Sequence, residues 1–90
     1  MEAGQQPIDL DAERTFLGGL MLATELNEDH LRSVQPEDFF DRRHRLIFES
    51  ICQESEGGGA DAPSLVVIDR LRSQGALQTA GGAEYIEQIV

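Results

Sequence analysis

Residues 41–55, DRRHRLIFESICQES, are the stretch that decides the fold. One face of an α-helix is indicated by the i, i+3, i+4, i+7 spacing of His44, Ile47, Phe48 and Ile51. Asp41 precedes this run and is a favourable N-cap, because its carboxylate can accept a hydrogen bond from a free N–H of the first turn. The pattern predicts a central helix from Arg42 to about Ser55.

A first helix is predicted from Asp11 to Thr24, before the central one. Its apolar residues recur at helical spacing, and the acidic residues near its start suit the positive end of the helix dipole. The pair Gly18-Gly19 inside it costs roughly 1 kcal/mol per glycine relative to alanine. We therefore expect a close helix-helix contact at this pair; a break in the helix is the alternative.

The segment between these two helices is predicted to hold a short helix and a turn. Asn27 can cap a helix that runs to about Val34, and Pro36 ends it. Residues 36–40, PEDFF, then predict a single turn that delivers both phenylalanines to the core.

Two further helices are predicted after the glycine run at residues 57–59. Start signals at residues 63–64 and a glycine at position 75 bracket a helix from Leu65 to Gln74. Its β-branched start would also suit a strand, but Leu71 at helical spacing favours a helix. The last helix follows Gly81-Gly82 and reaches Val90 without a stop signal, which suggests a piece of a longer protein; a frayed natural terminus is the alternative.

These elements predict an all-α fold without a β-sheet. We expect a flexible arm at residues 1–9, which contain Pro7, and one compact multi-helix globular head at residues 10–90. The side chains expected to be largely buried in its core are Phe16, Leu20, Phe39, Phe40, Ile47, Phe48, Ile51, Leu71 and Ile86.

The charge balance argues against several functions. Seventeen acidic residues stand against seven arginines, for a net charge of −10, and such a surface repels the phosphate backbone of nucleic acids. A Walker A phosphate loop needs a lysine, and the chain has none. We therefore expect no direct nucleic-acid binding and no ATP hydrolysis. No apolar run approaches the roughly 20 residues of a membrane span, and no signal-peptide pattern is present, so a cytoplasmic location is expected.

No catalytic or metal-binding set is predicted. His44 and Cys52 lie about 12 Å apart along the predicted helix, at 1.5 Å per residue, which is too far for a base and its nucleophile. Cys52, as a single cysteine, is expected to be a small residue of the core or its boundary. We expect His44 to be a neutral, hydrogen-bonded structural histidine and His30 to lie on the surface.

A basic cluster, Arg42, Arg43 and Arg45, stands out on this acidic chain. One interpretation is a surface that receives an acidic partner segment or a neighbouring subunit. The other is a solvated face whose arginines pair with the nearby acids Asp38, Asp41 and Glu49.

Three blocks of the sequence carry a resemblance to a known family. The first is residues 8–13 (IDLDAE) with 17–22 (LGGLML), the second is residues 36–41 (PEDFFD) with His44 and 47–48 (IF), and the third is residues 71–77 (LRSQGAL) with 81–86 (GGAEYI). In this order they resemble the N-terminal domain of the DnaB-type replicative DNA helicases of bacteria. The middle block, with its spacing to the others, is the specific one.

The resemblance implies a non-catalytic helical head. In the full helicase such a head is followed by a helical hairpin, a linker and a RecA-like motor domain, which would hold ATP and Mg²⁺, so no cofactor is expected in the head. It also implies a collar of heads on a hexameric ring, with surfaces for primase and in some cases a helicase loader. Two alternatives remain: the helicase-interaction domain of a primase, against which the middle block argues, and a free-standing small enzyme.

Within such a head, the last helix is the candidate docking element. Tyr85 offers a large apolar body with a hydroxyl, as suits a half-wet interface, and Ile89 continues the same side. The alternative is that Tyr85 fills the core of the head itself.

Overall fold

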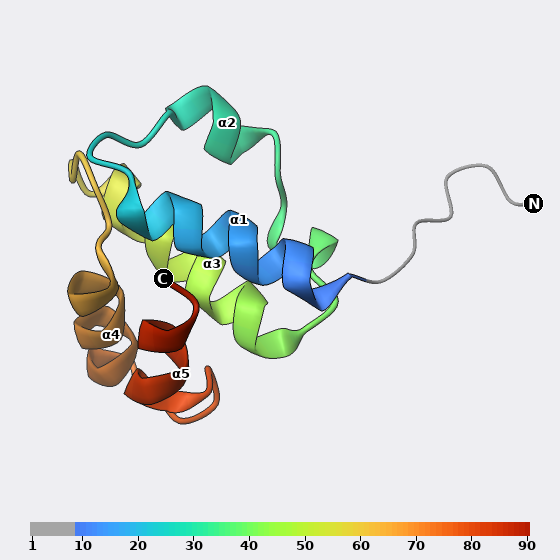
Figure 1. Cartoon of the computed structure of the whole chain (residues 1–90). Helices are drawn as coiled ribbons and strands as arrows, with labels where there is room; N and C mark the ends of the chain where they lie inside the picture. Colours follow the sequence, from blue (N-terminus) through green and yellow to red (C-terminus); the bar gives the residue numbers. More distant parts are fainter. Residues whose placement is uncertain (1–8) are drawn as a thin grey trace, which may run out of the picture.

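The computed structural model describes residues 9–90, and every regular element among them is helical. The elements are α1 (Leu10–Leu22), α2 (Glu28–Arg32), the 3₁₀ turn η1 (Pro36–Asp38), α3 (Arg42–Glu56), α4 (Ser64–Ser73) and α5 (Gly82–Gln88). The expected all-α architecture is therefore confirmed (Figure 1). The predicted arm lies outside the described residues except for Asp9, which is not free, because it caps α1.

Helix α3 is the centre of the fold, as its apolar spacing predicts. The Asp41 side chain accepts a hydrogen bond from the Arg43 N–H and so caps the helix. Ile47, Phe48 and Ile51 are fully buried. Helices α1 and α4 and the turn η1 all pack against α3, so α3 is the element that joins them into one core.

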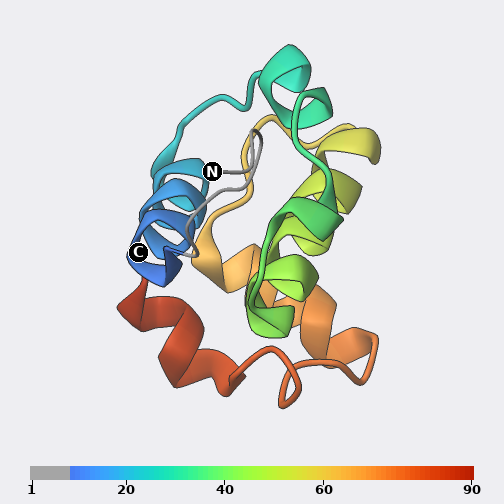
Figure 2. The same cartoon turned by 90° about the vertical axis from the view of Figure 1, so that its right-hand side faces the viewer.

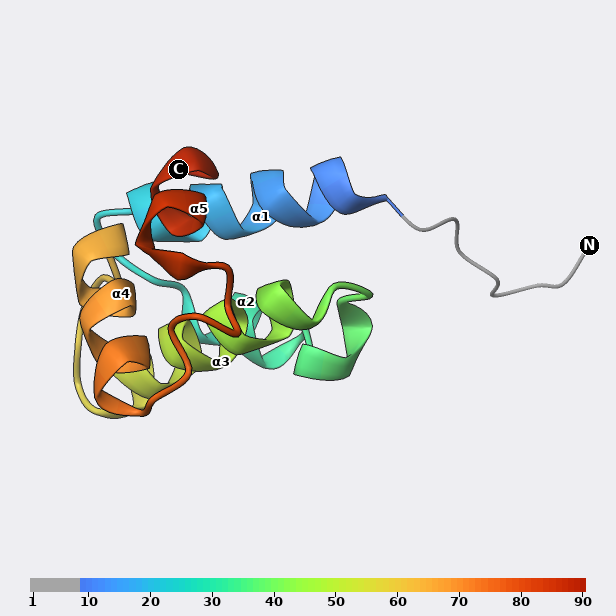
Figure 3. The same ribbon diagram turned by 90° about the horizontal axis from the view of Figure 1, so that it is seen from below.

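Helix α1 crosses α3 and also approaches the end of the chain. A Cβ atom at Gly18 would overlap the carbonyl oxygen of Ile89, which follows α5, whereas a Cβ atom at Gly19 would meet nothing within 4 Å. Figure 3 shows the C-terminal end lying beside α1. The close approach expected for the glycine pair is thus confirmed for Gly18 and wrong for Gly19, and the helix does not break.

The two phenylalanines after η1 point to different sides. Phe39 is 4% exposed, but Phe40 is 59% exposed, so the expectation that both enter the core is wrong for Phe40. Phe39 has an extended backbone, with ψ of 133°, and successive side chains of an extended backbone face opposite sides. Phe16, also expected to be largely buried, is only partly buried where it packs against the core.

Helices α4 and α5 close the other side of the core. The β-branched start of α4 forms a helix, because Val67, Ile68 and Leu71 share the buried face that packs on α3. Helix α5 packs on α4 and buries Ile86. It ends at Gln88, two residues earlier than expected, and Ile89 is its C-cap. Figure 2 shows α5 reaching the edge of the bundle next to α1.

Candidate interaction site

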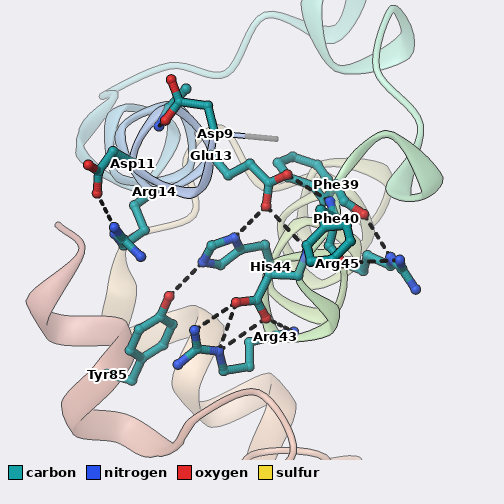
Figure 4. A network of polar contacts seen from close by, with 12 residues as sticks. Asp9, Asp11, Glu13, Arg14, Phe39, Phe40, Arg43, His44, Arg45 and Tyr85 are labelled. Atoms are coloured by element: carbon teal, nitrogen blue, oxygen red, sulfur yellow. Dashed lines mark hydrogen bonds and ion pairs between the residues drawn. The ribbon is translucent and has the colours of Figure 1, made fainter. Parts of the chain in front are cut away.

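A chain of hydrogen bonds joins α1, α3 and α5 through a buried histidine (Figure 4). His44 is fully buried; its Nδ1 lies 2.7 Å from Oε1 of Glu13, and its Nε2 lies 2.6 Å from the hydroxyl of Tyr85. A carboxylate only accepts, so Nδ1–H donates to Glu13, and the Tyr85 hydroxyl is the hydrogen-bond partner of Nε2. The expected hydrogen-bonded structural histidine is confirmed. We call Glu13, His44 and Tyr85 the three-helix relay.

Glu13 also holds the backbone at the start of α3. Its carboxylate accepts from the Phe40 N–H at 2.7 Å and from the Asp41 N–H at 3.4 Å. Burial by itself would raise the pKa of Glu13, but the hydrogen bonds from His44 and from these two N–H groups favour the charged form and lower the pKa below its ordinary value. One carboxylate therefore fixes both the entry to α3 and the orientation of His44.

Tyr85 is enclosed by two side chains of α3. Its ring stacks on the His44 ring, with centroids 5.9 Å apart and an interplanar angle of 12°, and the Arg43 guanidinium lies 4.1 Å from its centroid. Arg43 is held there by Asp41, with 2.7 Å between Nη2 and Oδ2. The hydrogen bond from Arg43 lowers the pKa of Asp41 to about 2, against the opposing effect of burial.

The ion pair between Asp41 and Arg43 predicts a loss of stability in acid. A carboxyl whose pKa is depressed in the folded state contributes stability that is present above its ordinary pKa of 3.8 and is lost as the pH falls toward about 2. Asp41→Asn keeps an N-cap residue but removes the charge. We expect the unfolding free energy of this variant, measured by urea titration at about pH 7, 4 and 2.5, to fall less between pH 4 and 2.5 than that of the wild type. Parallel curves for the two proteins would show that the pair does not contribute.

The three arginines of the basic cluster have different surroundings. Arg43 pairs with Asp41, as the interpretation of a solvated, paired face expects. Arg45 donates to the carbonyl oxygens of Phe39, at 2.8 Å, and Phe40, at 3.1 Å, so it secures the loop before α3. Arg42 is exposed and makes no ion pair within residues 9–90. The cluster is therefore only partly available to a partner.

The glycine before α5 makes room for Tyr85. Gly81 has a φ of +102°, which favours glycine, and a Cβ atom there would lie 2.7 Å from the Tyr85 ring. The Gly-Gly-x-x-Tyr pattern thus seats this ring on the first turn of α5. Ile89, the other residue expected to dock a partner, is partly buried against the core.

The remaining chemistry-bearing side chains stay apart. Cys52 is partly buried at the core boundary, as expected, and burial, with a smaller contribution from Glu56 and Glu49, raises the pKa of its thiol. His30 is exposed beside the edge of the Phe16 ring, with centroids 5.4 Å apart. In residues 9–90 no three potential metal ligands gather. No helix in this part of the chain is long and apolar enough to cross a bilayer.

Sequence reasoning missed Glu13 as a member of the site. An acidic residue near the start of α1 is already accounted for by the helix dipole, so the sequence gives no reason to look for a further partner. Its partner, His44, lies 31 residues further on. The signal that was available is its place in the first of the three family-like blocks, residues 8–13.

The fold and the relay define a small all-α domain whose first, central and last helices are joined by one buried polar chain. The sequence profile of the DnaB-like helicase N-terminal domain matches residues 5–90, and the chain belongs to this family.

Individual relatives agree with this assignment. The replicative DNA helicase DnaB of Leifsonia xyli subsp. xyli is 34% identical over 84 residues, which are 92% of this chain and 18% of that protein. The replicative DNA helicase DnaB of Mycobacterium leprae is 31% identical over 86 residues, 96% of this chain and 14% of that protein. The crystal structure of the N-terminal domain of DnaB helicase from Mycobacterium tuberculosis superposes with a TM-score of 0.82 at 30% identity, covering 94% of this chain and 60% of that one.

Proposed function

We propose that this chain is the non-catalytic N-terminal scaffold and docking domain of a bacterial replicative DNA helicase. In this role it supports assembly of the hexameric ring and offers a surface to primase or to a helicase loader in the cytoplasm. Family membership supports the proposal, as does the name replicative DNA helicase carried by two relatives. The chain matches only 18% and 14% of the length of those two proteins, so we assign ATP, Mg²⁺ and strand separation to other parts of the full protein.

The three-helix relay is the observation that carries the docking role. Its hydrogen bonds fix α5 against α1 and α3. His44 and Arg43, in the first turn of α3, contact Tyr85 of α5, and Arg42 in the same turn is exposed. A preorganised surface loses less entropy on binding. The docking surface that we propose consists of Arg42 with the accessible parts of Arg43, Arg45, Tyr85 and Ile89.

The domain is proposed to act through protein contacts and not through nucleic acid. A net charge of −10 opposes binding to phosphate backbones. The runner-up, a helicase-interaction domain of a primase, is disfavoured because the matching profile is that of the helicase N-terminal domain.

The test reverses the charge of Arg42 in the full-length helicase. Tyr85→Ala is a poor probe, because it would also leave the buried Nε2 of His44 without its partner. Arg42→Glu should keep the hexamer and its melting temperature but weaken stimulation by primase about tenfold, or about 1.4 kcal/mol. The matched control is Arg72→Glu on α4, an exposed arginine with one weak contact at 3.9 Å to Asp69. Equal primase response in the two variants would refute docking at Arg42.

A further inference from the structure

A groove separates α2 and the segment after it from the C-terminal half of α3. Its volume is about 570 Å³, within the range of roughly 300–1,000 Å³ that is typical of ligand sites. The groove is lined by side chains from residues 48–56 of α3, whereas the members of the three-helix relay and of the arginine cluster on this helix lie within residues 41–45. The groove is therefore a surface separate from the proposed docking face.

Helix α2, which forms one side of the groove, is short and has no extensive contact with another helix of the described residues. Helix α2 is a five-residue helix, Leu31 is its one buried side chain, and the chain on either side of it is not helical. Figure 1 shows α2 standing apart from α1 and α3. Because so few contacts hold α2, its position can adjust to an object in the groove at little cost.

The floor of the groove is apolar. Leu31 and Phe48 form its buried part, and Val34 and Cys52 line it as half-buried side chains. The pKa of the Cys52 thiol is raised, chiefly by burial, so the thiol stays uncharged at neutral pH and behaves as a small apolar group. Such a floor suits the apolar stripe of a helix.

The rim of the groove is acidic. Glu28, Glu49 and Glu56 line it, and the arginine on the rim, Arg32, already pairs with Glu28 and Asp29. This field repels nucleic acid and anionic lipid. It also disfavours a second copy of this chain, whose net charge is −10, as the occupant of the groove.

We propose that the groove between α2 and α3 binds an amphipathic helix of a partner protein, with apolar residues along one stripe and lysine or arginine flanking it. The apolar stripe would cover Val34 and Cys52, and the flanking cations would lie over Glu49 and Glu56. This inference does not depend on the proposed function, because its surface shares no residue with the docking face around Arg42.

The test uses a designed peptide as the probe. The peptide has leucines at i, i+3, i+4 and i+7 and lysines elsewhere, and its counterpart carries glutamates in place of the lysines. Titration of the ¹⁵N-labelled 90-residue chain should shift the amides of residues 28–36 and 48–56 with the lysine peptide and leave them in place with the glutamate peptide. Shifts centred elsewhere on the chain, or none, would overturn the proposal.

Matched variants separate docking from general attraction between opposite charges. Glu49→Lys with Glu56→Lys should raise the Kd at least tenfold, or about 1.4 kcal/mol. The control, Asp69→Lys with Glu87→Lys, makes the same change in net charge at exposed positions of α4 and α5 outside the groove and should change the Kd less than twofold. Equal losses in the two double variants would overturn the proposal, because they would show binding to the acidic surface as a whole. Unchanged helical circular dichroism identifies folded variants.

Discussion

Replacing Phe48 with alanine is expected to cost about 3 to 5 kcal/mol of unfolding free energy. Phe48 is fully buried in the middle of α3, and its ring contacts those of Phe39 and Phe16, with centroids 5.2 and 6.3 Å away. A loss of this size is a large part of the total stability of such a domain, so the variant should unfold at a much lower temperature and urea concentration than the wild type. Thermal and urea melts followed by helical circular dichroism measure the effect.

Phe40→Ala is the matched control for this experiment. Phe40 is 59% exposed, and its hydrogen bonds to Glu13 and Arg45 use the backbone N–H and carbonyl, which the substitution keeps. We expect its stability to change by no more than about 0.5 kcal/mol. A wild-type melting temperature for Phe48→Ala, or an equal loss in the two variants, would contradict the central position of α3 and the different burial of the two rings.

The helices could be predicted because their signals are local. Asn27 and Asp41 cap α2 and α3 as expected, and each cap depends on an N–H two or three residues away. Phe40 could not be placed in this way. Whether Phe39 or Phe40 faces the core depends on the path of the backbone between η1 and α3, and Glu13, 27 residues away from Phe40 in sequence, holds that path.

A hydrogen-bonded His44 was predicted from the sequence, but its partners were not. A buried histidine in a helical first turn must satisfy both ring nitrogens, so a hydrogen-bonded His44 follows from its position in the apolar pattern. The identity of the partners does not follow, because Glu13 lies 31 residues before it and Tyr85 41 residues after it. Local spacing also cannot reveal that Arg43 covers the Tyr85 ring. Tyr85 consequently has a structural role inside the domain. From the sequence alone, such a role was the alternative to docking a partner.

The second large effect is expected at Gly18, where α1 meets the end of the chain. An alanine Cβ at this position would overlap the Ile89 carbonyl oxygen and lie 3.2 Å from its carbon, and neither backbone atom can rotate away as a side chain can. Overpacking of this kind costs about 1–3 kcal/mol or more. Gly18→Ala should therefore lower the unfolding free energy, measured by urea titration, although alanine is the better helix former.

Gly19→Ala supplies the control, because it makes the same chemical change one position along the same helix. Nothing lies within 4 Å of a Cβ atom at Gly19, so only the higher helix propensity of alanine acts there, and the variant should gain up to about 1 kcal/mol. Opposite signs for the two variants would place the close contact at Gly18. If both alanines stabilise the domain, the end of α5 does not press against α1 in solution, and the anchoring of α5 then depends on the three-helix relay and on its packing against α4.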